Sequence, residues 1–182
     1  MTDRMDRIDA RGGEGSPERT EQDGAALVDL RHAPGALRGR VLALNARHEV
    51  ETAPLDAARL DRLIALSCSA TARADGQAFL LACDADAPHD GARFAWFRAR
   101  LDAFVYVDRI VVAPALRGTG LARRLYGMVI AHAAARGWPV VCEVNADPPN
   151  PRSAAFHARL GFEEMACEAA DRGKTVSYLI RR

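Results

Sequence analysis

Residues 106–122 read YVDRIVVAPALRGTGLA, and this stretch decides the fold of the chain. An apolar run typical of a β-strand ends at Pro114, and a short loop with Arg117, Gly118 and Gly120 leads directly into an amphipathic helical pattern. Glycines let a backbone approach a ligand closely, and the first amide N–H groups of a helix have no partner within the helix. The stretch therefore predicts an anion site at the start of the helix.

Three phosphate-binding loops compete for this stretch. A P-loop requires a Lys directly after its second glycine, and no Lys follows Gly120. A dinucleotide-binding loop requires a third glycine where this chain has Arg123. The remaining pattern, Arg117-x-x-Gly120-x-Ala122, is the phosphate-binding signature of acyl-CoA-dependent transferases. An ordinary turn is the alternative, because turn chemistry alone accounts for many such glycines.

A second stretch, residues 150–162, reads NPRSAAFHARLGF. Its Pro lies at the start of a helical pattern and its Gly ends it, as is typical of helices. Together the two stretches resemble the signature motifs of the GNAT superfamily of acyl-CoA-dependent N-acyltransferases, in the family's order. His157 is the one departure, because the family usually has Tyr there. The resemblance covers about residues 40–182, and the matching positions of the second motif are Asn150, Ser153, Phe156, Gly161 and Phe162.

The resemblance implies an α/β fold, with a splayed mixed β-sheet between layers of helices. The residue patterns agree, because strand and helix signals alternate along the chain. Asp75-Gly76 is a strong hairpin signal, since both residues tolerate positive φ. The expected strands are Val41–Leu44 and residues 70–74, 77–83, 103–112, 139–144, 162–168 and 175–180. Four helices are expected: one that starts near Thr52, a short one in an insert with Phe94, Trp96 and Phe97, and two at residues 121–136 and 151–160.

Residues 1–36 are expected to be a disordered N-terminal extension, and residues 37–182 a single domain. The first 24 residues contain seven acids and four arginines, and residues 1–36 contain no aromatic side chain. Such a segment buries too little apolar surface to offset the entropy of ordering it. The remaining chain is long enough for one hydrophobic core.

Composition narrows the partners and the location. The formal net charge of +1, from 25 basic and 24 acidic residues, argues against a nucleic-acid binder. No run of 18 apolar residues and no secretory signal pattern is found, so we expect a cytoplasmic protein, monomeric or homodimeric, that does not bind membranes. The four cysteines are widely spaced and are expected to be reduced, mostly buried and without metal.

The resemblance implies acetyl-CoA as co-substrate. The central strand near Ile110–Val112 would pair with the pantetheine arm, which enters where this strand splays from the strand at Cys142–Val144. A backbone N–H near Val112 would polarise the thioester carbonyl. Arg117 and the helix-start amides would face the pyrophosphate. The candidate cofactor-binding residues are Ile110, Val111, Val112, Arg117, Gly118, Thr119, Gly120, Leu121, Ala122, Arg123, Asn150 and Ser153.

Three residues are candidates for catalysis. His157 stands where the family's Tyr donates to the leaving thiolate, and its imidazole suits proton transfer; the alternative is that it only packs beside the cofactor. Glu143 and Asp108 are candidate general bases, because acids within apolar strands are unusual unless paired or functional. Asp108 would otherwise form a salt bridge, though not with Arg109, whose side chain alternates to the opposite face. Tyr126 is expected to be a packing or surface residue.

The expected reaction is acetyl transfer from acetyl-CoA to an amine, either a small molecule or a peptide, by direct attack. The acceptor pocket would involve the first helix, the insert at residues 94–97 and the loop at residues 145–149, with Glu143 and Asn145 on one face of their strand. A non-catalytic acyl-CoA sensor on the same fold is the alternative. The histidines without a predicted role, expected to pack or lie on the surface, are His32, His48, His89 and His132.

Overall fold

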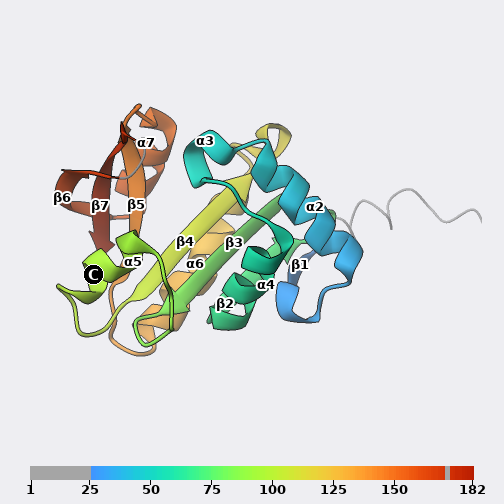
Figure 1. The fold of residues 1–182 in the computed structure, drawn as a ribbon, viewed down its shortest axis with the longest axis horizontal. Helices are drawn as coiled ribbons and strands as arrows, with labels where there is room; N and C mark the ends of the chain where they lie inside the picture. Colours follow the sequence, from blue (N-terminus) through green and yellow to red (C-terminus); the bar gives the residue numbers. More distant parts are fainter. Residues whose placement is uncertain (1–25, 171–172) are drawn as a thin grey trace, which may run out of the picture.

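Seven strands form one mixed sheet in the computed structural model, which describes residues 26–170 and 173–182 (Figure 1). The strand order is β1-β2-β3-β4-β5-β7-β6, and β4 and β5 are the parallel pair among the described strands. The expected α/β fold is therefore confirmed. The strands are β1 (Leu27–Asp29), β2 (Ser69–Arg73), β3 (Ala78–Asp84), β4 (Val105–Val112), β5 (Val140–Asp147), β6 (Glu163–Ala169) and β7 (Thr175–Arg181).

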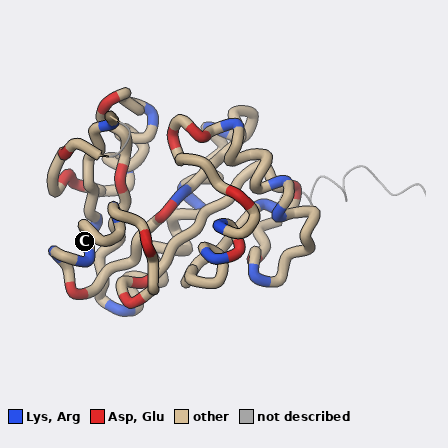
Figure 2. The backbone as a smooth tube through the Cα atoms, in the orientation of Figure 1, with Lys and Arg blue, Asp and Glu red and all other residues tan. Residues whose placement is uncertain are grey.

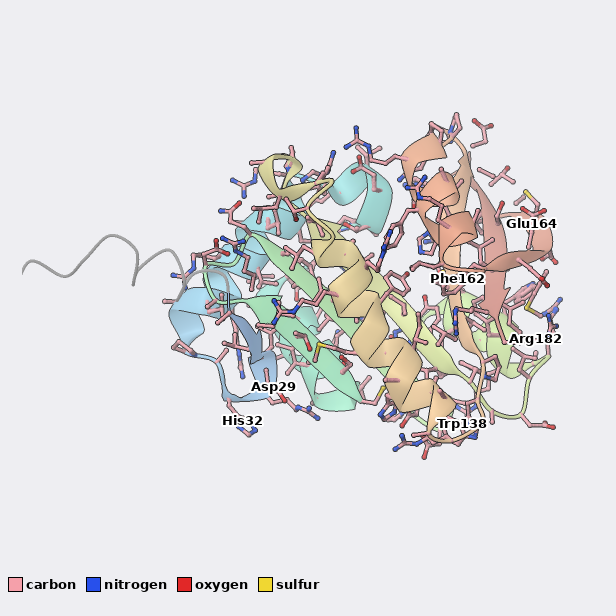
Figure 3. All side chains as sticks on the ribbon, turned by 180° about the vertical axis from the view of Figure 1, so that it is seen from behind. Asp29, His32, Trp138, Phe162, Glu164 and Arg182 are labelled. Atoms are coloured by element: carbon pink, nitrogen blue, oxygen red, sulfur yellow. The ribbon has the colours of Figure 1, made fainter. Side chains whose placement is uncertain are left out.

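Helices cover both faces of this sheet. Helices α2, α3, α4 and α5 lie on the face turned to the viewer in Figure 1. Helices α6 and α7 lie on the opposite face, which is turned to the viewer in Figure 3. The bounds are α2 (Gly35–Ala46), α3 (Glu49–Thr52), α4 (Ala57–Leu66), α5 (Ala92–Arg98), α6 (Leu121–Ala134) and α7 (Pro151–Arg159), with short 3-10 turns η1 (Leu30–His32) and η2 (Pro114–Leu116).

Local sequence signals explain several of these boundaries. Gly76 adopts a φ of 76° in the turn between β2 and β3, and the Asp75 carboxylate accepts the Gln77 N–H at 3.0 Å. Helix α4 begins directly after Asp56, whose carboxylate caps it by accepting the Arg59 N–H at 2.7 Å. The hairpin predicted from the Asp-Gly pair is confirmed, whereas the helix predicted from Thr52 onward begins only at residue 57.

The sheet opens between its two parallel strands. Strands β4 and β5 pair only at Val105↔Val140 and Tyr106↔Val141. Beyond these pairs β4 stays with β3, while β5 stays with β7. The predicted splay is confirmed, and it leaves a wedge whose walls carry the candidate functional residues.

The segment Val41–Leu44 is part of helix α2, so the predicted strand is wrong. Leu37, Val41 and Leu44 repeat at spacings of four and three residues and are at most 2% exposed, which is the pattern of a helix face. Four apolar-rich residues in a row do not distinguish a buried strand from part of a helix.

Part of the expected N-terminal extension is folded. Strand β1 pairs with β2 from Leu27↔Arg73 to Asp29↔Thr71, and the Leu30 side chain is fully buried among residues of α2 and α4. The prediction of disorder is therefore wrong for residues 26–36. Residues 1–25 lie outside the described part of the chain.

Charges of both signs are interspersed in both halves of the molecule (Figure 2). This distribution matches the balanced composition of the chain. Within the described residues, no helix combines the length and apolarity needed to cross a membrane.

Candidate functional site

A pocket of about 590 Å³ lies at the start of helix α6. Gly120 precedes the helix with a φ of 86°, a left-handed conformation that favours glycine, and no side chain of the described residues caps the helix. The amide N–H groups of the first helical turn therefore remain available to a ligand. Four arginines from three segments also line the pocket: Arg117, Arg123, Arg152 and Arg159.

Most of the predicted cofactor residues line this pocket. Thr119 does not, since its hydroxyl donates to the Leu116 carbonyl at 2.8 Å and stabilises the loop from within. Arg117 donates through Nε to the Val112 carbonyl at 3.2 Å, which holds its guanidinium beside the end of β4. The lining residues that were not predicted as site residues come from α3, η2 and α7 and their flanks: His48, Glu51, Thr52, Leu116, Arg152, Phe156, Arg159 and Leu160.

A second cavity of about 100 Å³ lies in the wedge between β4 and β5. It shares wall residues with the large pocket, among them Ile110, Ser153 and His157, so the two spaces adjoin. All three candidate catalytic residues line the small cavity. The structure thus brings the proposed acid and bases together at the inner end of the large pocket.

Glu143 on β5 is an acid of this cavity that is buried and only partly hydrogen-bonded. Its side chain is 9% exposed, and Oε1 accepts hydrogen bonds from Arg93 and from the Tyr106 hydroxyl, both at 3.2 Å. The other oxygen, Oε2, is buried without a hydrogen-bond partner among the described residues. Burial raises the pKa of Glu143 to about 7, although the nearby Arg93 guanidinium opposes the shift. A carboxylate with an unused oxygen and a pKa near neutrality is suited to accept a proton.

Asp108 on β4 differs because it is fully paired. Its oxygens bind His89 Nε2 at 2.9 Å and Arg109 Nε at 2.6 Å. Burial favours the neutral acid, but the two partners outweigh it and bring the pKa of Asp108 to about 2. Such a carboxylate stays ionised and is a poor base at neutral pH.

The prediction that Arg109 points away from Asp108 is wrong. The register between β3 and β4 shifts, so that Leu81 pairs with Arg109 and Ala82 with Val107. Asp108 is the extra residue of this β-bulge, and a bulge interrupts the strict alternation of side chains between the two faces. The two neighbouring side chains therefore meet.

His157 on α7 and Tyr126 on α6 form a buried pair. Nε2 of His157 lies 2.7 Å from the Tyr126 hydroxyl, and Nδ1 lies 2.8 Å from the Ser153 carbonyl oxygen. A carbonyl only accepts, so Nδ1 carries the proton of the neutral ring and Nε2 accepts from Tyr126. Burial lowers the pKa of His157, which favours this neutral form.

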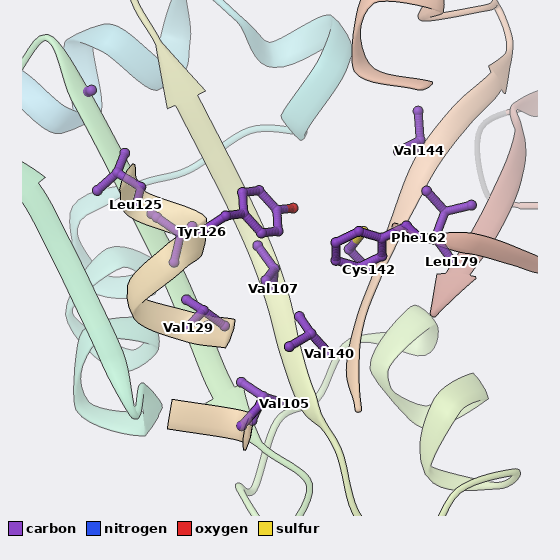
Figure 4. Packing of buried hydrophobic residues seen from close by; sticks show 14 residues of the cluster. Val105, Val107, Leu125, Tyr126, Val129, Val140, Cys142, Val144, Phe162 and Leu179 are labelled. Atoms are coloured by element: carbon purple, nitrogen blue, oxygen red, sulfur yellow. The ribbon is translucent and has the colours of Figure 1, made fainter. Parts of the chain in front are cut away.

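The Tyr126 ring extends from α6 with its hydroxyl directed towards the strand that carries Cys142 (Figure 4). The side chain is 1% exposed, yet it lines the small cavity together with His157. Tyr126, expected from the sequence to be a packing or surface residue, is thus buried with its hydroxyl at the cavity. Its helix position gave no sign of this, because the partner comes from a helix 31 residues away.

Asn45 fixes the segment that covers the cavity. This fully buried side chain donates to the Ala53 carbonyl at 3.0 Å and accepts from the Thr52 hydroxyl at 3.2 Å. Arg109 also donates to Asn45 Oδ1, at 3.1 Å. Helix α3 is therefore tied through Asn45 to the ion pair on β4.

The aromatic insert does not form an acceptor pocket. Phe94 and Phe97 are at most 1% exposed in the core, and Trp96 stacks on Tyr178 with 3.9 Å between ring centroids. Of helix α5, Arg93 is the residue that lines the cavity. The expected apolar wall is therefore replaced by a cation beside Glu143.

One cluster away from the cavity brings together Cys68, Asp84 and His132, with ligand atoms within 4.8 Å of one another. The Arg136 guanidinium donates to Nδ1 of His132 at 3.1 Å, so Nε2 carries the proton and donates to Asp84 at 3.0 Å. Hydrogen bonds thus account for the orientation of His132, and the nitrogen that faces the cluster carries a proton.

Comparisons with known proteins agree with this arrangement. Residues 45–162 match the family model described as the Acetyltransferase (GNAT) family. This range contains both sequence motifs and the residues that line the two cavities. None of the curated proteins compared matches the chain.

Solved structures share the fold. Naa50 of Arabidopsis thaliana, in complex with the bisubstrate analogue CoA-Ac-MVNAL, matches with a TM-score of 0.63 and 11% identity over 86% of this chain and 97% of that one. NAA60 of the same plant, in complex with acetyl-CoA, matches with a TM-score of 0.62 and 12% identity over 86% and 98%. An agmatine N-acetyltransferase variant matches with a TM-score of 0.58 and 14% identity over 86% and 98%. Identities this low show the common fold alone.

Proposed function

Because this chain belongs to the GNAT acetyltransferase family, we propose that it transfers an acetyl group from acetyl-CoA to a primary amine held in the small cavity. The observation that carries the proposal is the junction of the two spaces. A large pocket with four arginines and an uncapped helix start adjoins a small cavity in which Glu143 has an unused, buried oxygen. The first suits a polyphosphate, and the second suits an amine.

Acetyl-CoA would lie with its pyrophosphate at the first turn of α6. Arg117 and Arg123 flank this turn, and Arg152 and Arg159 approach from α7. Charge-assisted hydrogen bonds and the helix dipole both favour phosphate there. The pantetheine arm would follow the edge of β4 near Ile110–Val112, which β5 leaves unpaired.

Glu143 would act as the general base. The attacking nitrogen forms the new C–N bond to the acetyl carbon, the C–S bond breaks, and the amine proton passes to Oε2. A pKa of about 7 lets the carboxylate form exist at neutral pH while keeping it basic enough to accept a proton. Asp108 would serve as a positioning residue, since its pKa of about 2 removes it from proton transfer.

Tyr126 would stabilise the leaving thiolate by turning its hydroxyl towards the sulfur. Burial raises the pKa of Tyr126 well above its ordinary value, so the hydroxyl keeps its proton and donates a hydrogen bond. The thiolate then takes up a proton from water. In the resting pair the single hydroxyl proton is donated to Nε2 of His157, which would hold the phenol in place until the hydroxyl turns to the sulfur.

Two measurements on the full chain test the proposal. Calorimetry measures binding of acetyl-CoA, and a thiol-reactive dye measures release of CoA in the presence of primary amines. We expect micromolar or tighter binding and amine-dependent release. Binding without release for any amine would instead support the acyl-CoA sensor, and absence of binding would contradict both.

A further inference from the structure

Helix α3 closes the wedge above the small cavity. The Val50 carbonyl, at the centre of this helix, accepts hydrogen bonds from Asn145 Nδ2 at 3.3 Å and from Lys174 Nζ at 2.6 Å. Asn145 belongs to β5, and Lys174 directly precedes β7. The carbonyl of one short helix therefore ties α3 to the half of the splayed sheet that contains β5 and β7. We call these three residues the bridge.

The bridge is anchored on its other side as well. Thr52 and Ala53, at the end of α3, are bound by the buried side chain of Asn45 on α2. Ala53 adopts a φ of 73°, a backbone conformation that is rare for residues other than glycine. The surrounding contacts must therefore hold this backbone in place. Helix α3 is thus held from α2 on one side and from β5 and the approach to β7 on the other.

The cavity beneath the bridge is small and polar. Glu51 and Thr52 of α3 and Asn145 of β5 are among its walls, so the residues around the bridge also line the cavity. Its volume of about 100 Å³ is well below the ~300–1,000 Å³ of pockets that hold drug-sized ligands. The buried Oε2 of Glu143 offers one acceptor without a partner in the described chain.

We propose that the acceptor is a small primary amine of a few non-hydrogen atoms, and that the bridge excludes peptide termini and protein lysines. A peptide continues beyond its amino group and needs an open groove, whereas here α3 is bonded to both β5 and the segment before β7 above the cavity. The unpartnered carboxylate oxygen receives the amine N–H. This inference rests on the proposed acetyl transfer.

A competition between acceptor classes tests the inference on the full chain. The small amines are ethylamine, propylamine, ethanolamine and 1,3-diaminopropane; the larger acceptors are tetra-alanine amide, with an unblocked N-terminus, and acetyl-Ala-Lys-Ala amide. We expect kcat/KM for the best small amine to exceed that for either peptide by at least about 10²-fold, since a single methylene in a fitted pocket already changes kcat/KM by about 10–200-fold. Equal or better turnover of a peptide overturns the inference and leaves the proposed acetyl transfer intact.

Variants of the bridge give the second readout. Lys174→Met removes the hydrogen bond to Val50 and keeps an aliphatic stem, so we expect kcat/KM for tetra-alanine amide to rise by at least about tenfold relative to that for ethylamine. Lys174→Arg keeps a cationic donor and should keep the original preference. Arg182→Met, which removes an exposed cation from the residue after β7, is the matched control. An unchanged ratio of peptide to amine turnover in Lys174→Met contradicts the exclusion. If no acceptor of either class releases CoA although acetyl-CoA binds, the proposed function itself is wrong.

Discussion

The Tyr126 hydroxyl on α6 and Nε2 of His157 on α7 lie 2.7 Å apart, and both residues line the small cavity. The Ser153 carbonyl fixes the proton of the ring on Nδ1, so the pair has a direction: the phenol donates and the imidazole accepts. The side chain at the family's tyrosine position therefore supports a tyrosine from another helix. Of these two side chains, Tyr126 carries the proton that lies between them.

Removal of this hydroxyl should slow turnover more than removal of the imidazole. We expect Tyr126→Phe to lower kcat by about 10–10²-fold, since a hydrogen bond to a charged group contributes ~1.5–3 kcal/mol. His157→Phe should lower kcat less, because the hydroxyl remains. Steady-state kinetics with a good acceptor measure both, and Tyr178→Phe, which alters a tyrosine stacked on Trp96, is the control. A larger loss in His157→Phe would restore the histidine as the acid.

The pH dependence of kcat/KM should report Glu143. The carboxylate form is the active base, so activity should rise as the pH increases through about 7, the raised pKa of this residue. Glu143→Gln should remove this rise and lower kcat/KM by about 10²–10⁴-fold. The exposed Glu164→Gln should leave the profile unchanged. A wild-type profile without a group near pH 7 would assign proton removal to water.

The same group makes the folded state sensitive to pH. Its pKa is raised on folding, so the folded protein binds a proton more tightly than the unfolded chain does. This contribution to stability is fully present below the ordinary glutamate pKa of about 4.3 and is lost as the pH rises through about 7. Denaturant titrations from pH 5 to 8 should show a fall in the free energy of unfolding that is smaller in Glu143→Gln. An equal fall in the wild type and the variant would assign the pH dependence to other groups.

The sequence predicted those parts of the fold that depend on local chemistry. The hairpin at Asp75-Gly76 follows from backbone conformations that these residues permit, and the α7 start follows from Asn150 and Pro151. The loop side of the large pocket was predictable for the same reason, since Arg117, Gly118 and Gly120 lie in one continuous stretch, whereas Arg152 and Arg159 were not predicted. Strand β1 was missed because three residues in a polar segment acquire their strand conformation from pairing with β2.

The small cavity depends on contacts that no local pattern encodes. The Asp108–Arg109 pair results from a register shift against β3. The Tyr126–His157 pair joins two helices, and the Val50–Lys174 contact spans 124 residues of sequence. Strict alternation and helix periodicity place side chains on faces, but they do not say which faces meet. The side-chain pairs around the small cavity could therefore be identified only from the tertiary structure.

Arg117 should contribute mainly to cofactor affinity. We expect Arg117→Ala to weaken acetyl-CoA binding by ~1.5–3 kcal/mol, the contribution of a charged hydrogen bond to phosphate. The exposed Arg124 on α6 is not among the residues that line the pocket, so Arg124→Ala is the matched control. Calorimetry should show a loss only in the first variant. Equal losses would point to long-range attraction rather than a contact at the helix start.

The N-terminal edge of the domain should be essential for stability. A protein that begins at Leu37 lacks β1, which pairs with β2, and lacks Leu30, whose side chain is fully buried against α2 and α4. We expect it to unfold well below the full chain, whereas a protein that begins at Ala26 should retain the melting temperature. Leu30→Ala isolates the core contribution and should cost about 2–5 kcal/mol, the usual loss for a buried leucine. Arg31→Ala, which breaks only a surface pair with Asp29, should cost at most about 1 kcal/mol. If the shorter protein melted with the full chain, β1 would be an accessory strand, and the domain would begin near residue 37, as the sequence alone predicted.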